Sequence, residues 1–95
     1  MYYWQPVIYY KKHLSNYEEH FNHDEQMKAL YLKAYGLIRK NYPELAKYHF
    51  YDISDIFANH QGPLYIDYCH VDEEGNKEIA QRMAGDVLKL IKPNN

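Results

Sequence analysis

The chain has a single cysteine, Cys69, and only four glycines and four prolines among its 95 residues. One cysteine cannot form an intrachain disulfide, so the cysteine content leaves the redox compartment undetermined. Apolar residues make up 46% of the chain, and this share, together with the scarcity of Gly and Pro, argues against a disordered protein. A chain of this length normally folds as one small domain, which we expect to span residues 1–95.

Long apolar runs and basic patches are also missing. No run approaches the roughly 18 residues of a membrane-spanning helix. The first ten residues lack the basic start and the small-residue cleavage site of a secretory signal. The formal net charge is −2, and the densest basic cluster, Lys11-Lys12-His13, is typical of a solvated surface. We therefore expect a soluble segment of unknown localisation, with no nucleic-acid partner and no membrane contact.

Two segments have the composition of β-strands. Residues 2–10 are rich in aromatic and β-branched types, and because Pro6 removes one backbone donor, the dependable strand within them is Val7–Tyr10. The second segment, Tyr48–Ile53, is also aromatic and β-branched, with two polar interruptions. Between them, the polar stretch Lys11–His23 is predicted to be a loop that holds at most a short helical turn.

Two helices are predicted from apolar residues that recur at intervals of three and four. The first runs from about Asp24 to Asn41, and Pro43 is expected to end it. The second begins near Asp72, a suitable N-cap, and stops before Pro93. The apolar face of the first helix comprises Met27, Leu30, Tyr31, Ala34 and Ile38. The predicted buried face of the second comprises Ile79, Ala80, Met83, Ala84, Val87, Leu88 and Ile91.

The predicted order is strand, helix, strand, loop, helix, and the loop covers Asp55 to Tyr65 and the residues around Asp67. Alternating strands and helices favour an α/β fold with parallel strands and right-handed crossovers. Two parallel strands form a narrow sheet with open edges, and parallel sheets are usually wider and covered on both faces. The topology therefore predicts further strands from a missing segment or from another chain, including a homo-oligomer.

A carboxylate and an imidazole stand three residues apart in the segment Asp67-Tyr68-Cys69-His70. An aspartate that accepts a hydrogen bond from one ring nitrogen fixes the tautomer of a histidine and leaves the other nitrogen free to take a proton. Asp67 and His70 therefore have the chemistry of half a catalytic triad. In a purely structural interpretation, the same bond only pins the start of the following helix.

Other residues near this pair are weaker candidates for chemistry. Cys69 is adjacent to His70, but neighbouring side chains in extended backbone point apart, which favours a packed thiol over a nucleophile. The chain has six histidines, and His60, Asp67, His70 and Asp72 are possible metal ligands. No histidine has the tight ligand spacing of a zinc site, so we expect neither a metal nor a cofactor.

Twelve tyrosines offer ring faces on which a carbohydrate can stack. Tyrosine is also favoured in strands for structural reasons, which accounts for most of those in the predicted strand segments. Tyr65 and Tyr68 lie beside the Asp67 and His70 pair in the sequence. These two tyrosines are therefore the candidates for substrate contact.

The stretch from Asp67 to Ala80 resembles the last sequence block of the SGNH (GDSL) hydrolase family. In that block, Asp-x-x-His is followed by a Gly and by an amphipathic helix with Ile-Ala, and the matching residues here are Asp67, His70, Gly75-Asn76 and Ile79-Ala80. Earlier segments resemble the family's last two strand-helix units more loosely. The resemblance implies a partial flavodoxin-like three-layer fold, equivalent to the C-terminal half of a hydrolase domain.

The resemblance also implies the hydrolysis of an ester or thioester through an acyl-enzyme, with His70 as general base and Asp67 as its orienting carboxylate. In the family, the nucleophilic serine belongs to a Gly-Asp-Ser motif, and other blocks contribute the oxyanion hole. Neither Ser15 nor Ser54 follows Gly-Asp. We therefore expect the missing N-terminal half or a partner chain to supply the nucleophile, and the isolated chain to be nearly inactive. The ester substrate, acylated carbohydrates included, is left open.

A competing hypothesis is a non-catalytic interaction module. Such a protein keeps the strand-helix scaffold and oligomerises through its open sheet edges. It would form a stable oligomer and would not react with a fluorophosphonate probe for serine hydrolases. Its function would survive the substitution His70→Ala.

Overall fold

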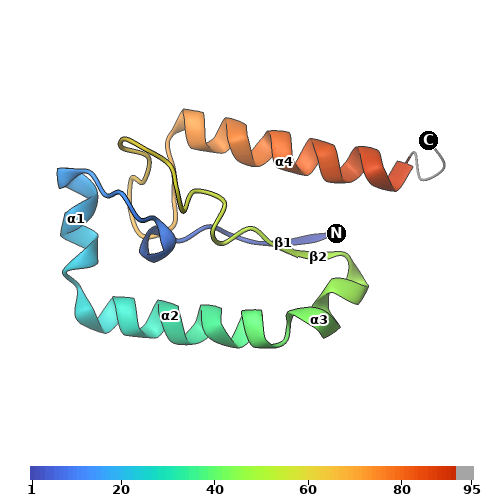
Figure 1. The fold of residues 1–95 in the computed structure, drawn as a ribbon, viewed down its shortest axis with the longest axis horizontal. Helices are drawn as coiled ribbons and strands as arrows, with labels where there is room; N and C mark the ends of the chain where they lie inside the picture. Colours follow the sequence, from blue (N-terminus) through green and yellow to red (C-terminus); the bar gives the residue numbers. More distant parts are fainter. Residues whose placement is uncertain (92–95) are drawn as a thin grey trace.

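The computed structural model describes residues 1–91, in which helices and strands are mixed (Figure 1). The element order is β1 (Tyr2–Trp4), the 3-10 helix η1 (Ile8–Tyr10), α1 (Asn16–Asn22), α2 (Glu25–Lys40), α3 (Tyr42–Leu45), the 3-10 helix η2 (Ala46–Tyr48), β2 (Phe50–Asp52) and α4 (Glu73–Ile91). Pro93, which was predicted to follow the last helix, lies outside the described residues.

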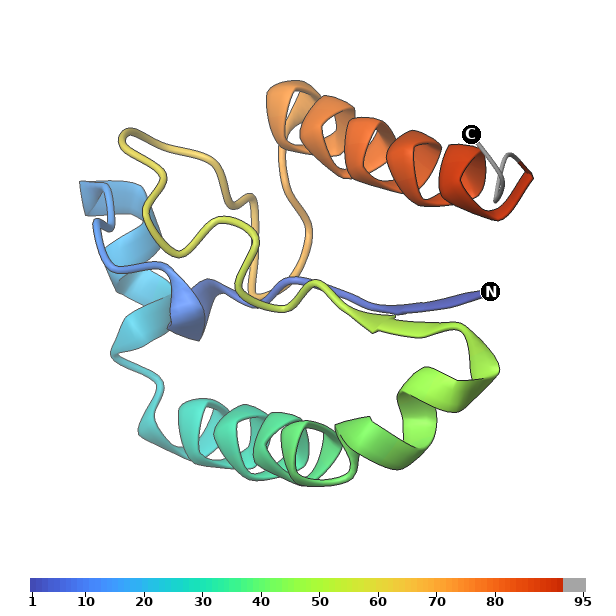
Figure 2. The ribbon, with the colours of Figure 1, turned by 45° about the vertical axis from the view of Figure 1, so that its right-hand side comes forward.

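The two strands found in residues 1–91 pair in parallel, as predicted, with Tyr3 opposite Tyr51. Helix α4 runs along one side of this pair and α2 along the other, and a second view shows the same arrangement (Figures 1 and 2). On the α4 side, the hydroxyl of Tyr3 donates to Asp86 Oδ2 at 2.8 Å. On the α2 side, the Trp4 ring lies 5.1 Å from that of Tyr35. The strand pair is therefore the middle layer between two helical layers.

The strand predicted at Val7–Tyr10 is wrong. The strand β1 comes earlier, and the chain turns into the 3-10 helix η1 directly after Val7. The backbone N–H of Ile8 donates to the carbonyl of Tyr68 at 2.9 Å instead of to a neighbouring strand. Pro6 explains the change, because it has no N–H with which to continue a ladder at this point.

The loop predicted at Lys11–His23 is also wrong, because residues 16–22 form the helix α1. Ser15 begins this helix with a capping box. Its Oγ accepts from the backbone N–H of Glu18 at 3.2 Å, and its own N–H donates to Glu18 Oε1 at 2.9 Å. The Ser-x-x-Glu pattern is present in the sequence and is the signal that predicts this helix.

The predicted helix from Asp24 to Asn41 is confirmed in α2. Asp24 caps it by accepting from the backbone N–H of Met27 at 3.1 Å, and Asn41 is the residue that follows its last turn. Pro43 does not itself end α2. It lies in the first turn of α3, where the missing N–H of proline leaves no helical hydrogen bond unmade. The strand β2 falls within the predicted segment Tyr48–Ile53.

The predicted start of the last helix is confirmed as well. Asp72 Oδ1 accepts from the backbone N–H of Gly75 at 2.9 Å, which caps α4. The core lies next to this end of α4, and Ile79 packs against it. The buried members of this core cluster are Ile8, Phe57, Leu64, Tyr65 and Val71.

The predicted buried face of α4 is wrong over most of its length. Ile79 and Met83 are half-buried, whereas the remaining members, Ala80, Ala84, Val87, Leu88 and Ile91, are exposed, with Ile91 65% exposed. The sheet in residues 1–91 has only two strands, which leaves no strand for these side chains to cover. The second half of α4 therefore presents an unpaired apolar surface, hereafter the α4 apolar face, defined by Val87, Leu88 and Ile91. Surfaces of this kind are typical of interaction sites.

Gly75 is expected to tolerate no larger side chain. A Cβ at this position would lie 2.7 Å from Val71 Cβ and 3.1 Å from Leu64 Cδ1. We expect Gly75→Ala to lower the free energy of unfolding by about 1–3 kcal/mol, because the core must shift to admit the methyl group. Gly85→Ala is the matched control in the same helix, since nothing lies within 4 Å of its Cβ position. In urea denaturation, the free energy of unfolding of the control should rise by about 0.5–1 kcal/mol. Equal losses for both variants would refute the packing argument.

Candidate functional site

The segment that contains Asp67 and His70 is a loop closed at its base by antiparallel pairing. Tyr65 and Val71 form an isolated β-bridge, and the backbone N–H of Ile66 donates to the carbonyl of His70 at 2.8 Å. Tyr65 and Val71 are also buried members of the core, so both ends of the loop are anchored there. They hold the loop that carries Asp67 and His70, hereafter the 65–71 loop, against the rest of the fold.

A buried carboxylate, Glu18, fixes the entry to this loop. Its Oε2 accepts from the backbone N–H of Leu64 at 3.3 Å and from that of Tyr65 at 2.9 Å. Its Oε1 lies 2.9 Å from Lys11 Nζ, and both side chains of this ion pair are fully buried. Burial opposes ionisation of Glu18, but hydrogen bonds from the Ser15 backbone and from Lys11 outweigh it and lower the pKa of the carboxyl. Glu18 thus joins α1 to the 65–71 loop.

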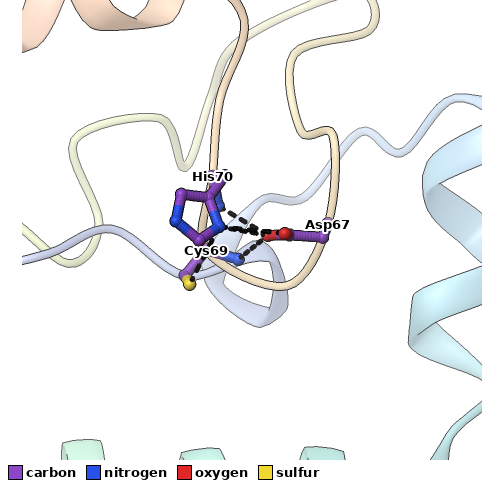
Figure 3. A group of neighbouring side chains, drawn as sticks. All are labelled: Asp67, Cys69 and His70. Atoms are coloured by element: carbon purple, nitrogen blue, oxygen red, sulfur yellow. Dashed lines mark hydrogen bonds and ion pairs between the residues drawn. The ribbon is translucent and has the colours of Figure 1, made fainter.

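Asp67 and His70 form the contact that the sequence suggested (Figure 3). Nδ1 of His70 lies 2.9 Å from Asp67 Oδ2 and 3.0 Å from Oδ1. The backbone N–H groups of Cys69 and His70 both donate to Asp67 Oδ1, at 3.0 and 2.8 Å. A single carboxylate therefore shapes the turn and orients the imidazole.

The geometry defines which nitrogen of His70 is basic. An ionised carboxylate only accepts hydrogen bonds, so Nδ1 carries the proton that it shares with Asp67. Nε2 is then the nitrogen with a free lone pair, and it has no hydrogen-bond partner among residues 1–91. The side chain of His70 is 74% exposed. Nε2 is accordingly accessible to a group from outside the described residues.

Ionisation of Asp67 should hold the turn together. Partial burial raises the pKa of Asp67, but hydrogen bonds from the Cys69 and His70 backbone and from the His70 ring outweigh it, so the pKa is lowered. A lowered pKa in the folded state contributes stability that is present above the unfolded value of about 3.9 and is lost as the pH falls through the folded value. We therefore expect the amide protons of Cys69 and His70 to be protected from hydrogen exchange near neutral pH and to lose that protection below the folded pKa of Asp67. Unchanged protection in the variant Asp67→Ala would contradict this account.

Cys69 lies closer to His70 than the sequence suggested. Its Sγ is 3.8 Å from His70 Nδ1, because the backbone bends here and brings neighbouring side chains to one side. Burial raises the pKa of the Cys69 thiol, and the nearby Asp67 carboxylate raises it further. A raised pKa is the opposite of what activates a cysteine nucleophile, and Nδ1 already donates to Asp67. The arrangement favours a thiol that is not activated for attack.

Both serines of the chain have structural partners. Ser15 caps α1, and the buried Ser54 accepts from Arg39 Nη2 at 3.1 Å. Neither hydroxyl is hydrogen-bonded to His70 in the part of the chain that the structure describes. The site in residues 1–91 is therefore an imidazole hydrogen-bonded to a carboxylate, and it contains no partner hydroxyl at Nε2.

The two tyrosines predicted to contact substrate lie in different environments. Tyr65 is 3% exposed and belongs to the core, and burial raises its pKa. Tyr68 is half-buried, and its hydroxyl donates to Asp24 Oδ2 at 2.9 Å. Packing explains the position of Tyr65 without a ligand, and the substrate role of Tyr65 and Tyr68 stays a prediction.

An apolar groove lies between the end of β1 and α2, which the sequence reasoning missed although the apolar face of the helix was its signal. Its volume is about 240 Å³. It is lined by Trp4, Gln5, Met27, Leu30, Tyr31, Ala34 and Tyr35. The Tyr31 ring stacks on that of Tyr68 with centroids 5.8 Å apart, which connects the groove to the 65–71 loop.

The potential metal ligands are not grouped as the sequence suggested. His60 packs against the Phe57 ring and Asp72 caps α4, so neither joins Asp67 and His70. The structure brings together Asp67, Cys69 and His70, with one ligand atom of each within 4.8 Å of the others. Cys69 is the member of this group that the sequence reasoning did not treat as a ligand.

Comparisons of the chain with family models, curated proteins and solved structures found no match. The geometry of the site is that of a histidine whose Nδ1 is hydrogen-bonded to an aspartate. Among residues 1–91, no helix has both the length and the apolar content needed to cross a bilayer.

Proposed function

We propose that this chain supplies the Asp–His half of a Ser-His-Asp triad in an SGNH-type ester hydrolase. The contact of His70 Nδ1 with Asp67 at 2.9 Å carries the proposal, because it leaves Nε2 basic and exposed. Backbone hydrogen bonds hold the carboxylate in place before any substrate arrives. This preorganisation is what a base needs in order to act in one defined direction.

In the proposed reaction, the hydroxyl of a serine from outside residues 1–91 lies against His70 Nε2. As the serine oxygen attacks the ester carbonyl, Nε2 takes its proton, and Asp67 stabilises the resulting imidazolium. The imidazolium then gives the proton to the departing alkoxide, which leaves as an alcohol. Water repeats the sequence on the acyl-enzyme and releases the acid. Donors that stabilise the tetrahedral intermediate are expected from the same source as the serine.

A partial flavodoxin-like three-layer fold belongs to this proposal. It is supported by the parallel pairing of β1 and β2 and by the position of α2 and α4 on opposite sides of the pair. Further strands from an N-terminal half or from a partner chain would extend the sheet beneath the α4 apolar face. The exposure of Val87, Leu88 and Ile91 is the observation that favours such a partner.

The groove beside the 65–71 loop favours an ester with an apolar acyl group. Most of its lining is apolar, as expected of a small-molecule site, and Tyr31 connects it to Tyr68. An acylated carbohydrate also fits the proposal if its sugar lies over the exposed side of the loop.

The second candidate function is a non-catalytic interaction module that oligomerises through its open sheet edges. The observation that favours it is the two-stranded sheet in residues 1–91 together with the α4 apolar face. Analytical ultracentrifugation measures the oligomeric state of the chain, and a stable homo-oligomer would support the interaction module. A monomer that gains activity only with a second chain supports the hydrolase.

The decisive test of the hydrolase proposal combines sequencing with labelling. We would sequence the native gene on the 5′ side of the Met1 codon and its neighbours, and then treat the encoded proteins with a fluorophosphonate probe. A Gly-Asp-Ser block together with labelling that requires this chain would support the proposal. The lack of any labelled serine in the natural assembly would overturn it.

A further inference from the structure

Three different ligand atoms meet at the tip of the 65–71 loop (Figure 3). A carboxylate oxygen of Asp67, the sulfur of Cys69 and a ring nitrogen of His70 all lie within 4.8 Å of one another. This combination of oxygen, sulfur and nitrogen suits Zn²⁺ and other thiophilic divalent cations, whereas Mg²⁺ and Ca²⁺ prefer oxygen alone.

The separations are close to those of a tetrahedral site. With bonds of about 2.3 Å to sulfur and about 2.0–2.1 Å to nitrogen or oxygen, neighbouring ligand atoms are roughly 3.3–3.6 Å apart. Cys69 Sγ lies 3.8 Å from His70 Nδ1, and Asp67 Oδ2 lies 2.9 Å from the same nitrogen. Small side-chain rotations therefore bring all three atoms to bonding distance from one ion.

The loop is also held in a shape that suits chelation. Asp67 Oδ1 accepts the backbone N–H groups of Cys69 and His70, whereas the partner of Oδ2 is His70 Nδ1, so Oδ2 becomes available when that nitrogen loses its proton to bind the same ion. The carbonyl of Tyr68 is anchored by the backbone N–H of Ile8 at 2.9 Å. Binding would release the thiol proton, and one carboxylate and one thiolate would then balance the two positive charges of the ion. The largely exposed His70 leaves room for water as a fourth ligand.

We propose that Asp67, Cys69 and His70 form a binding site for Zn²⁺ or a similar thiophilic cation. A consequence, which rests on the proposed function, follows from the tautomer of His70. A metal on Nδ1 replaces the proton that donates to Asp67, so the neutral ring carries its proton on Nε2. Nε2 then has no lone pair with which to accept the serine proton. Occupation of the site and use of His70 as a base therefore exclude each other.

Titration of the full chain with Co²⁺ tests the site independently of catalysis. We expect binding of one ion, with a thiolate-to-cobalt charge-transfer band and the intense visible absorption of a tetrahedral complex, both abolished when Zn²⁺ is added. Cys69→Ser should remove the charge-transfer band and weaken binding at least tenfold. His13→Ala, which alters an exposed histidine outside the loop, should behave as the unaltered chain. No band at saturating Co²⁺, or the same band in Cys69→Ser with circular dichroism unchanged, would overturn the proposal.

Zn²⁺ inhibition of the assembled hydrolase separates this proposal from the proposed function. We expect the inhibition constant to rise at least tenfold in Cys69→Ser, with each variant compared to its own rate without metal. Cobalt binding in a protein that never hydrolyses esters would support the site and count against the function. Hydrolysis that Zn²⁺ inhibits equally with and without Cys69 would support the function and overturn the site.

Discussion

Replacing His70 with alanine is expected to lower kcat/KM of the assembled hydrolase by about 10³- to 10⁶-fold, because the serine loses its proton acceptor. The assay measures the hydrolysis of a p-nitrophenyl ester by this chain together with the segment or chain that carries the serine. The exposed side chain of His70 makes few packing contacts, so the folded state should survive the substitution. A loss of less than tenfold would contradict a role as base and would favour the interaction module.

Asp67→Asn and His13→Ala are the companion variants for this measurement. An asparagine at position 67 keeps an oxygen that can accept from the backbone N–H groups. Its amide group can also donate to Nδ1, which favours the His70 tautomer with the proton on Nε2, and this tautomer cannot act as the base. We expect a loss of up to about 10⁴-fold in kcat, as for other triads that lose their aspartate charge. His13→Ala should retain full activity, because that histidine lies outside the loop.

Replacing Glu18 with alanine is expected to have the largest effect on stability. The substitution leaves Lys11 buried without its counter-charge and leaves the backbone N–H groups of Leu64 and Tyr65 without their acceptor. Removing one partner of a buried ion pair typically costs about 3–5 kcal/mol, which is a large part of the stability of a small domain. Urea denaturation followed by circular dichroism measures the loss.

The control for Glu18 is Glu19→Ala in the same helix, whose side chain is less buried and which should change stability by less than about 0.5 kcal/mol. Because the pKa of Glu18 is lowered in the folded state, its contribution is present above the unfolded value of about 4.3 and is lost as the pH falls through the folded value. Equal losses for the two variants would show that α1, and not the Glu18 carboxylate, sets the stability.

The helices were the part of the fold that the sequence predicted best. The bounds of α2 were predicted from its apolar periodicity, which begins at Asp24, together with Pro43, and the start of α4 was predicted because Asp72 is a suitable capping residue. The helix α1 was missed because its polar composition concealed the capping box of Ser15 and Glu18. Composition also misplaced the first strand, since the aromatic residues on either side of Pro6 look alike while only those before it pair with β2.

The site was predicted in part. The contact between Asp67 and His70 follows from their spacing, because a four-residue turn brings its first and fourth residues close together. The proximity of Cys69 was not predicted, since it depends on a bend in the backbone and not on residue type. Burial of Tyr65 and of Glu18 likewise depends on contacts between segments distant in sequence, which no local pattern contains.

Trp4 is a built-in fluorescence probe for binding at the end of β1. It is the one tryptophan in the sequence, and its ring forms part of the groove wall. Its Nε1–H and the Tyr35 hydroxyl are buried and have no hydrogen-bond partner within residues 1–91, although such groups normally find one. A strand or ligand that binds there and supplies an acceptor would shift the emission wavelength and change the fluorescence lifetime of the indole. Candidate partners can therefore be screened by intrinsic tryptophan fluorescence, before any substrate is known.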